Sequence, residues 1–347
     1  MKQCLKDRKL LIVTRTFAGR RRKMFELQSQ IFGEVKVITK IGESLPEVTF
    51  LSGFGNIEQL IRQYQPDVLH INIDFSEPVY KLLDLQYPKA KVLDMYDCSE
   101  MRGAPDQHLR DVYQNYPDIP KIFSSEKHLE YITAKYGRQN DNDNDNYYFI
   151  PNVPLLSWLP RQRKLKIEGD SLVYFGGIIG EWNDAFCYRY YYDLFKIFIE
   201  AGIAVHVYPS QVSKKLQRYI DIGVVFHKTV PMRDLYNELT QYQVGFVGYN
   251  DIGENINHTA VDYATKCLPN KAFDYLFAGI PTLAYNLGYA EKFTSRWGIC
   301  IHDVELLIDA YYAVKEQNIN INYERWQKMF CLENYKKDLV NIYQGIL

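Results

Sequence analysis

The sequence predicts an α/β fold in two similar halves, each with a parallel β-sheet covered by helices. Short apolar runs with strand character alternate with amphipathic helical stretches along the chain, a pattern typical of parallel sheets with helical crossovers. The chain has 347 residues, which exceeds the ~100–200 residues of a usual domain. The alternation also restarts after a proline-containing, basic segment at 151–170, so two domains are expected.

The individual elements follow from the spacing of apolar residues, which has period two in half-buried strands and three to four in helices. In the first half we expect strands at 9–14, 35–39, 67–72, 91–95 and 122–124, and helices at 20–32, 57–64 and 126–136. In the second half we expect strands at 171–175, 203–208, 224–226, 244–248 and 282–285, and helices at 185–201, 213–220, 232–239, 271–278, 304–315 and 323–347. The polar, low-complexity segment 139–146 predicts a solvated loop between elements.

Composition narrows the class of protein. The chain is 47% hydrophobic and 24% charged with a net charge of −1, as in ordinary globular domains, and it lacks the basic excess expected of a nucleic-acid binder. Six single cysteines without metal or redox spacing fit reduced thiols. The apolar runs are too short for a signal peptide or a membrane span. We therefore expect a cytoplasmic protein whose membrane contact, if any, is peripheral and at the inner face.

The most informative segment is LPNKAFDYLFAGIPTLAY at 268–285. Asn270 is a suitable helix N-cap, and Gly279 stands where a helix C-terminal glycine belongs. The start of such a helix offers free N–H groups and a positive dipole end, which suit a diphosphate, and Lys271 adds a charge there. Asp274, one turn in, could accept two hydrogen bonds from a ribose diol. Because acids near a helix start are favoured without any ligand, a purely structural role also stays open.

This segment resembles the donor-binding signature of GT-B glycosyltransferases, especially the family 4-like group (glycosyltransferase group 1 type), approximately P-x-K-x-x-E-Y-x-x-x-G-x-P. The matching positions are Pro269, Lys271, Asp274, Tyr275, Gly279 and Pro281. The resemblance implies that Asp274 binds the ribose, although glutamate is usual there. Many relatives carry a second glutamate eight positions earlier, which contacts the donor sugar. This chain has Lys266 instead, which leaves open the donor sugar, the stereochemical course and activity itself.

Further segments resemble the same group. VYFGGIIGEWND at 173–184 is similar to the opening of its C-terminal domain, and Gly176 and Gly177 would let a phosphate or sugar approach the backbone at a strand end. A tight turn that needs two glycines is the alternative. FIPNV at 149–153 resembles the end of the N-terminal domain, and the last helical stretch resembles the helix that crosses back to that domain.

The resemblance implies a domain organisation. It comprises two Rossmann-like domains facing across a cleft, the GT-B fold, with the C-terminal helix crossing back to the N-terminal domain. Residues 1–155, with the helix at about 330–347, would form the acceptor domain. Residues 170–325 would form the nucleotide-sugar-binding domain, and 156–169 the linker.

Two acids in the first half are candidate catalytic residues. Asp97 follows the strand expected at 91–95, in a segment similar to a rim segment of the same group. It could act as a general base or orient the acceptor hydroxyl, and capping of the following turn is equally open. Asp74, just past the strand expected at 67–72, is the second candidate. His70 within that strand is expected to be a hydrogen-bonded core histidine.

A basic loop follows the first strand, in the segment RTFAGRRRK. Gly19 permits a close turn, and Arg15, Arg20 and Arg21 could contact an acceptor phosphate or anionic lipid headgroups. A solvated basic helix face is the alternative interpretation.

The function expected from these residues is transfer of a sugar from a nucleoside diphosphate sugar to a glycan, a lipid-linked acceptor or another acceptor hydroxyl. GT-B enzymes commonly need no bound metal, and we expect neither metal nor cofactor here. A nucleotide-sugar epimerase of the same architecture is an alternative, although acid–base groups to flank the sugar are not identifiable. A non-catalytic nucleotide-sugar-binding subunit is another, which Lys266 keeps open. A nicotinamide oxidoreductase is disfavoured, because no G-x-G-x-x-G follows a strand.

Overall fold

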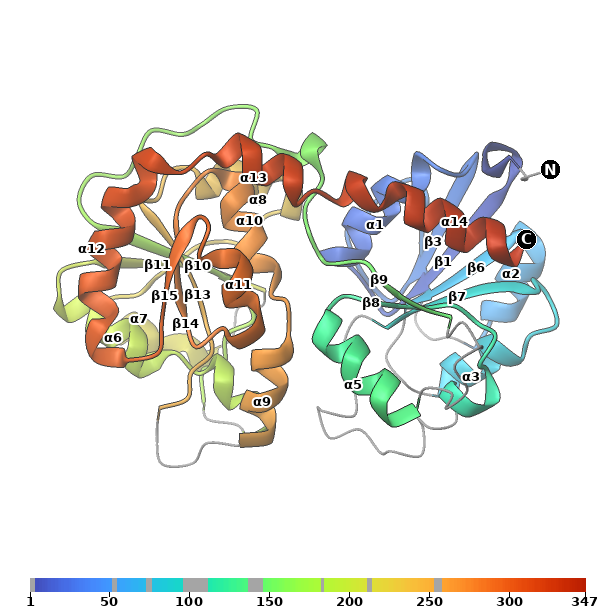
Figure 1. Cartoon of the computed structure of the whole chain (residues 1–347), viewed down its shortest axis with the longest axis horizontal. Helices are drawn as coiled ribbons and strands as arrows, with labels where there is room; N and C mark the ends of the chain where they lie inside the picture. Colours follow the sequence, from blue (N-terminus) through green and yellow to red (C-terminus); the bar gives the residue numbers. More distant parts are fainter. Residues whose placement is uncertain are drawn as a thin grey trace. The chain divides into compact units, whose positions relative to one another are not determined.

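The chain divides into two compact units in the computed structural model, which describes residues 4–51, 55–72, 77–95, 112–136, 146–181, 184–210, 214–252 and 258–347. The first unit consists of Met1–Leu155 with Leu332–Leu347, and the second of Leu156–Cys331. Each has a central parallel sheet with helices on both faces (Figure 1). The predicted α/β fold with two Rossmann-like domains is confirmed.

The first unit is built on a seven-stranded sheet with the order β5-β3-β1-β6-β7-β8-β9. Its strands are β1 (Lys9–Thr14), β3 (Glu34–Thr39), β5 (Val48–Phe50), β6 (Val68–Asn72), β7 (Ala90–Met95), β8 (Lys121–Phe123) and β9 (Tyr147–Phe149). Its helices are α1 (Arg20–Ser29), α2 (Ile57–Tyr64), α3 (Glu77–Asp84), α5 (Glu126–Tyr136) and α14 (Lys336–Ile346). A short parallel pair, β2 (Thr16–Phe17) and β4 (Ile41–Gly42), lies beside it. The strand order reverses between β1 and β6, which makes their carboxyl ends the switch point of this sheet.

The second unit is built on a six-stranded sheet with the order β12-β11-β10-β13-β14-β15. Its strands are β10 (Ser171–Gly176), β11 (Ala204–Pro209), β12 (Val225–Phe226), β13 (Val244–Gly248), β14 (Thr282–Tyr285) and β15 (Gly298–Ile301). Its helices are α6 (Tyr192–Glu200), α7 (Gln217–Asp221), α8 (Met232–Leu239), α9 (His258–Lys266), α10 (Asn270–Ala278), α11 (Glu291–Thr294), α12 (Leu307–Gln317) and α13 (Tyr323–Met329). The order reverses between β10 and β13, so the ligand-binding edge expected of this sheet lies at their carboxyl ends.

The core of the second unit accounts for part of the tyrosine content. Buried side chains from β10, β11 and β13 pack against α6 and α12 in one continuous cluster. Tyr174, Tyr191, Tyr219 and Tyr311 belong to it, all less than 2% exposed. Most of these rings meet edge to face or tilted, as aromatic pairs prefer. These tyrosines are therefore structural.

Two predicted helices are interrupted in the structure. The stretch predicted at 185–201 forms a 3-10 helix, η3 (Asp184–Arg189), and then α6, with non-helical dihedrals at Phe186. The backbone N–H of Tyr191 donates to the hydroxyl of Tyr219 at 3.0 Å. The stretch predicted at 323–347 breaks at Phe330 (φ −112°, ψ 40°), where the chain passes from the second unit to the first. An amphipathic pattern that continues through a break cannot reveal it.

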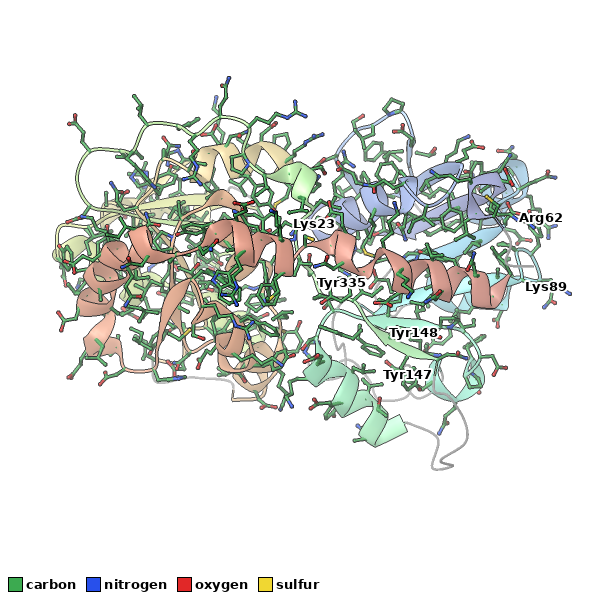
Figure 2. The ribbon with its side chains drawn as sticks, turned by 45° about the horizontal axis from the view of Figure 1, so that its top comes forward. Lys23, Arg62, Lys89, Tyr147, Tyr148 and Tyr335 are labelled. Carbon is green, nitrogen blue, oxygen red and sulfur yellow. The ribbon has the colours of Figure 1, made fainter. Side chains whose placement is uncertain are left out.

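The C-terminal helix α14 belongs to the first unit, as predicted. Its Tyr343 is fully buried, with the hydroxyl 3.0 Å from Nδ1 of His70, and it accepts a hydrogen bond from Nε2 of Gln28 at 2.6 Å. His70 is thus the hydrogen-bonded core histidine that the sequence predicted. At the edge of the sheet formed by β9, Tyr147 (labelled in Figure 2) packs edge-on against Phe123 of β8, with ring centroids 6.0 Å apart.

None of the helices in the described part of the chain combines the length and the apolar character needed to cross a membrane.

Candidate functional site

The switch point of the second sheet brings two consecutive glycines against two cations. β10 ends at Gly176, whose φ of +103° is readily adopted only by glycine. A Cβ placed on Gly176 would lie 3.2 Å from Cε and 3.4 Å from Nζ of Lys271. A Cβ placed on Gly177 would lie 2.9 Å from Nη1 of Arg189. Lys271 and Arg189, here called the cationic pair, therefore lie directly over the backbone at the carboxyl end of β10.

Arg189 reaches this place because the chain leaves the helical path before it. It closes η3, and its guanidinium lies over the rings of Tyr188 and Phe186, with its carbon 5.2 Å and 5.8 Å from the ring centroids. Sequence reasoning missed Arg189. It stands in a run of tyrosines and matches no motif, so only its position in the fold reveals it.

The surroundings of Lys271 disfavour its protonated form. Burial lowers the pKa of its ammonium group to about 7, and the positive charge of Arg189 acts in the same direction, while Asp274 opposes them. The Nζ atom lies 4.9 Å from the ring centroid of Tyr174. An anion bound between the cationic pair would favour the protonated form of Lys271, since an opposite charge nearby raises an ammonium pKa.

Helix α10 presents Lys271 because a tyrosine fixes it to the switch point. The hydroxyl of Tyr275 lies 2.9 Å from the carbonyl oxygens of both Val173 in β10 and Phe246 in β13. Gly245 is required beneath it, because a Cβ there would come within 2.4 Å of the Tyr275 ring. Helix α10 is thereby fixed against the two strands that flank the switch point.

Of the two ends of α10, the C-terminal end agrees with the prediction and the N-terminal end differs by one residue. Gly279 is left-handed (φ 68°, ψ 39°) and terminates the helix, as predicted. At the start, Pro269 is the N-cap and Asn270 is the first helical residue, with no side-chain capping hydrogen bond, which corrects the predicted cap by one position. The first turn contains no acidic residue, so its N–H groups and dipole are not offset by a carboxylate there.

Asp274 does not occupy a ligand-accessible position. It is 0% exposed, and its Oδ1 accepts a hydrogen bond from the hydroxyl of Tyr236 in α8 at 2.5 Å. Burial and the nearby carboxylate raise the pKa of Tyr236 well above its usual value, so the hydroxyl stays a donor. Asp274 thus joins α10 to α8, and the predicted ribose contact is wrong, because the whole residue is buried and its Oδ1 is bonded to Tyr236.

We expect Tyr236→Phe to lower the free energy of unfolding by about 1–3 kcal/mol, because the buried carboxylate loses a hydrogen-bond donor. Urea denaturation of parent and variant measures the change. Tyr312→Phe, on an exposed ring of α12, is the matched control and should be nearly neutral. Equal stability of the Tyr236 variant and the parent would show that this contact does not hold α8 and α10 together.

Lys266, at the position of the family's first glutamate, lies at the end of α9. Its ammonium group forms an ion pair with Asp262 one turn earlier, and both side chains are partly exposed. At this position the chain therefore has a lysine in place of the usual glutamate, and this lysine is already paired with Asp262.

Some of the candidate site residues in the first half of the chain lie within the residues that the structure describes, and two do not. Asp97 and Asp74 lie outside the described residues and stay predictions. Arg15 is exposed directly after β1. Gly19, with φ +54°, is the N-cap of α1, and Nε of Arg21 donates to Oδ1 of Asn72 at 2.8 Å, at the carboxyl end of β6.

The structure contradicts the prediction made for Arg20. It is 2% exposed, its Nε lies 3.2 Å from Oδ2 of Asp94, and its Nη1 donates to the carbonyl of Ile150 at 2.8 Å. Burial by itself would raise the pKa of Asp94, but the charge of Arg20 and the hydrogen bond to His70 hold it at about 2. Arg20 is therefore one half of a buried ion pair, and its predicted contact with an acceptor or an anionic surface is wrong.

Comparison with known proteins shows which fold the chain has. No protein-family model and no curated protein sequence matches the chain. Among solved structures, HepE of Anabaena in complex with UDP-glucose aligns with a TM-score of 0.70 at 9% identity, covering 97% of this chain and 100% of that one. A glycosyltransferase from Rickettsia africae aligns with a TM-score of 0.65 at 11% identity, covering 98% of both chains.

Sucrose-phosphate synthase from Thermosynechococcus elongatus aligns with a TM-score of 0.63 at 12% identity, covering 97% of this chain and 99% of that one. At such low identity the likeness concerns the fold alone, and it extends over nearly the whole chain. The two Rossmann-like units of this protein therefore have the fold of the GT-B glycosyltransferases.

Proposed function

We propose that this protein is a glycosyltransferase that takes a sugar from a nucleoside diphosphate sugar and transfers it to the hydroxyl of a glycan, a lipid-linked acceptor or another acceptor. One observation carries the proposal: Lys271 and Arg189 lie over Gly176 and Gly177 at the switch point of the second sheet. Two cations, an adjacent helix start and a backbone without Cβ atoms suit a diphosphate. The likeness to HepE, solved with UDP-glucose, supports the same ligand class.

The chemistry follows from where negative charge develops. When the bond between the sugar and the diphosphate breaks, charge accumulates on the departing phosphate. Groups already oriented toward that charge stabilise the transition state. The cationic pair and the dipole of α10 would supply this stabilisation without a bound metal, so transfer should persist in the presence of a chelator.

The first unit would present the acceptor. We propose Asp97 as the base that receives the hydroxyl proton, with Asp74 as the other candidate, and Arg15 and Arg21 as contacts to an anionic acceptor or membrane surface. The reaction would take place in the cytoplasm, at the inner face of the membrane if the acceptor is lipid-linked. Asp274 has no part in the proposal, so the ribose must be bound by other residues.

A panel of nucleotide sugars in a thermal-shift assay tests donor binding, because a ligand that binds only the folded state raises the melting temperature. We expect one donor to stabilise the protein, and proton NMR of the donor with candidate acceptors then identifies the reaction. A new glycosidic linkage supports a transferase. Conversion of the donor sugar without an acceptor would indicate an epimerase, and an unchanged donor would indicate a binding subunit.

Donor binding should also take up a proton. Free Lys271, with a pKa of about 7, is mostly neutral at about pH 8, and the bound diphosphate raises this pKa, so binding brings a proton from the buffer. The affinity should accordingly fall as the pH rises above about 7. Calorimetric titration at about pH 8 in two buffers of different ionisation enthalpy measures the uptake. A binding enthalpy that is the same in both buffers would contradict the role of Lys271.

A further inference from the structure

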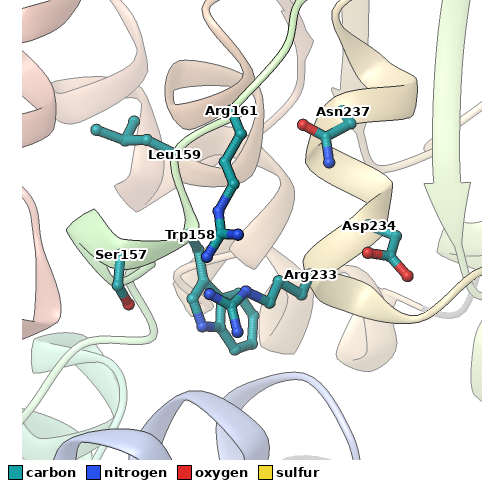
Figure 3. Close-up of a pocket in the computed structure, with 7 residues that line it drawn as sticks. All are labelled: Ser157, Trp158, Leu159, Arg161, Arg233, Asp234 and Asn237. Carbon is teal, nitrogen blue, oxygen red and sulfur yellow. The ribbon is translucent and has the colours of Figure 1, made fainter.

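A polar cavity lies in the second unit, with a volume of about 280 Å³. It is formed by the short helix η2 (Leu156–Trp158), the residues that follow it and the first turns of α8 (Figure 3). Its lining residues are Ser157, Trp158, Leu159, Arg161, Arg233, Asp234 and Asn237. The volume lies near the lower limit for small-molecule pockets, so the cavity suits a ligand about the size of one sugar residue with a substituent.

Two arginines give the cavity its charge. The side chains of Arg161 and Arg233 come from different segments and both line the cavity together with Trp158, whereas the carboxylate of Asp234 points away from them (Figure 3). Within the described part of the chain, neither guanidinium has an ion-pair or hydrogen-bond partner. Two like charges in one cavity without a counterion repel each other, so this arrangement favours a bound oxyanion.

The cavity also contains hydrogen-bond acceptors. Oδ1 of Asn237 is buried and has no hydrogen-bond partner among the described residues, and Ser157 adds a hydroxyl at the mouth. A buried acceptor without a donor is unfavourable. The hydroxyl groups of a sugar could supply that donor.

We propose that this cavity binds a phosphorylated sugar residue. The phosphoryl group is held by Arg161 and Arg233, whose planar forks match its oxygens. The sugar hydroxyls donate to Oδ1 of Asn237 and contact Ser157, and Trp158 forms the floor.

This site is independent of the proposed donor site, since the two share no residue. Trp158 packs against Tyr236 with ring centroids 5.9 Å apart, and Tyr236 in turn bonds to Asp274. These buried side chains separate the cavity from α10.

The test is calorimetric titration of the full chain in a Lys271→Met background, so that phosphate binding at the cationic pair does not contribute. Glucose 6-phosphate should bind, inorganic phosphate should bind more weakly, and glucose should not bind. Its methyl glycoside distinguishes the sources: equal binding indicates a residue within a glycan, and binding of the free sugar phosphate alone indicates a small-molecule ligand. Both results support the site. Equal affinity for inorganic phosphate and glucose 6-phosphate would overturn the sugar contact.

Variants locate the binding. Arg161→Ala and Arg233→Ala should each weaken glucose 6-phosphate binding by about tenfold or more, because each removes charge-assisted hydrogen bonds. Arg233→Lys keeps the positive charge but loses the planar guanidinium that can donate two parallel hydrogen bonds. This variant should bind glucose 6-phosphate more weakly than the parent. Asn237→Asp places a carboxylate next to the guanidinium groups at almost constant volume and should abolish binding. Unchanged melting temperatures confirm that the variants fold, and undiminished binding by the double Arg161→Ala/Arg233→Ala variant would overturn the proposal.

Discussion

Lys271→Met is expected to weaken nucleotide-sugar binding by roughly 10–100-fold, since a hydrogen bond to a charged group contributes ~1.5–3 kcal/mol. The same variant should stabilise the unliganded protein, because the folded parent must keep a partly buried, desolvated ammonium next to Arg189. A single substitution that stabilises the folded state and weakens binding is characteristic of a site whose residues are positioned for a ligand at the expense of stability. Titration calorimetry measures the first effect and urea denaturation the second.

The stability effect has a defined pH dependence. The pKa of Lys271 is lowered from 10.5 to about 7 in the folded protein, so between these values the unfolded chain binds more protons than the folded one. The parent should gain about 1.4 kcal/mol per pH unit from this group as the pH rises through that range. The advantage of Lys271→Met is therefore largest below about pH 7 and declines above it. Lys328→Met, which breaks an exposed pair with Glu324, is the control and should change neither binding nor this slope.

Arg20→Met is expected to destabilise the first unit by about 3–5 kcal/mol, because it leaves the buried carboxylate of Asp94 without its counter-charge. Against a total stability of ~5–15 kcal/mol for a typical protein, this is the largest loss that we expect from one substitution. Urea denaturation followed by circular dichroism measures it. Arg62→Met, at an exposed pair on the surface of α2 (Figure 2), is the matched control and should cost less than about 1 kcal/mol.

The double variant Arg20→Met/Asp94→Leu separates the lost partner from the lost packing. Buried pairs can often be replaced by apolar groups at little cost, whereas removing one partner is expensive. We therefore expect the double variant to recover most of the stability lost in Arg20→Met. If the losses of the two single variants simply add, the pair is not coupled and the description of this contact is wrong.

The sequence was sufficient for the fold class because the alternation of strands and helices is a local pattern. It was insufficient where tertiary contacts decide the structure. β9 and β15 are short and only partly buried, so they carry little periodic signal. The interruption before Tyr191 depends on a hydroxyl of Tyr219, which is distant in sequence, and no local pattern can show it.

In the candidate site, too, the residues marked by local signals were predictable, and the residue placed by tertiary structure was not. Lys271, Gly176 and Gly177 were found because a helix start and a strand-end glycine pair are local signals. Arg189 was not, because its place over Gly177 depends on the non-helical backbone at Phe186.

Two sequence assignments failed for a related reason. The direction of Asp274 is set by Tyr236 in another helix, and which arginine of the basic loop turns inward is set by Asp94 in β7. In both cases the sequence identified the residue and the fold decided its partner.

A crystal structure of the protein with a nucleoside diphosphate bound tests the central claim most directly. We expect phosphate oxygens within about 3.2 Å of Nζ of Lys271 and of the Arg189 guanidinium, next to the first N–H groups of α10 and over Gly176 and Gly177. A diphosphate bound elsewhere, with Lys271 and Arg189 making no contact to it, would contradict the account.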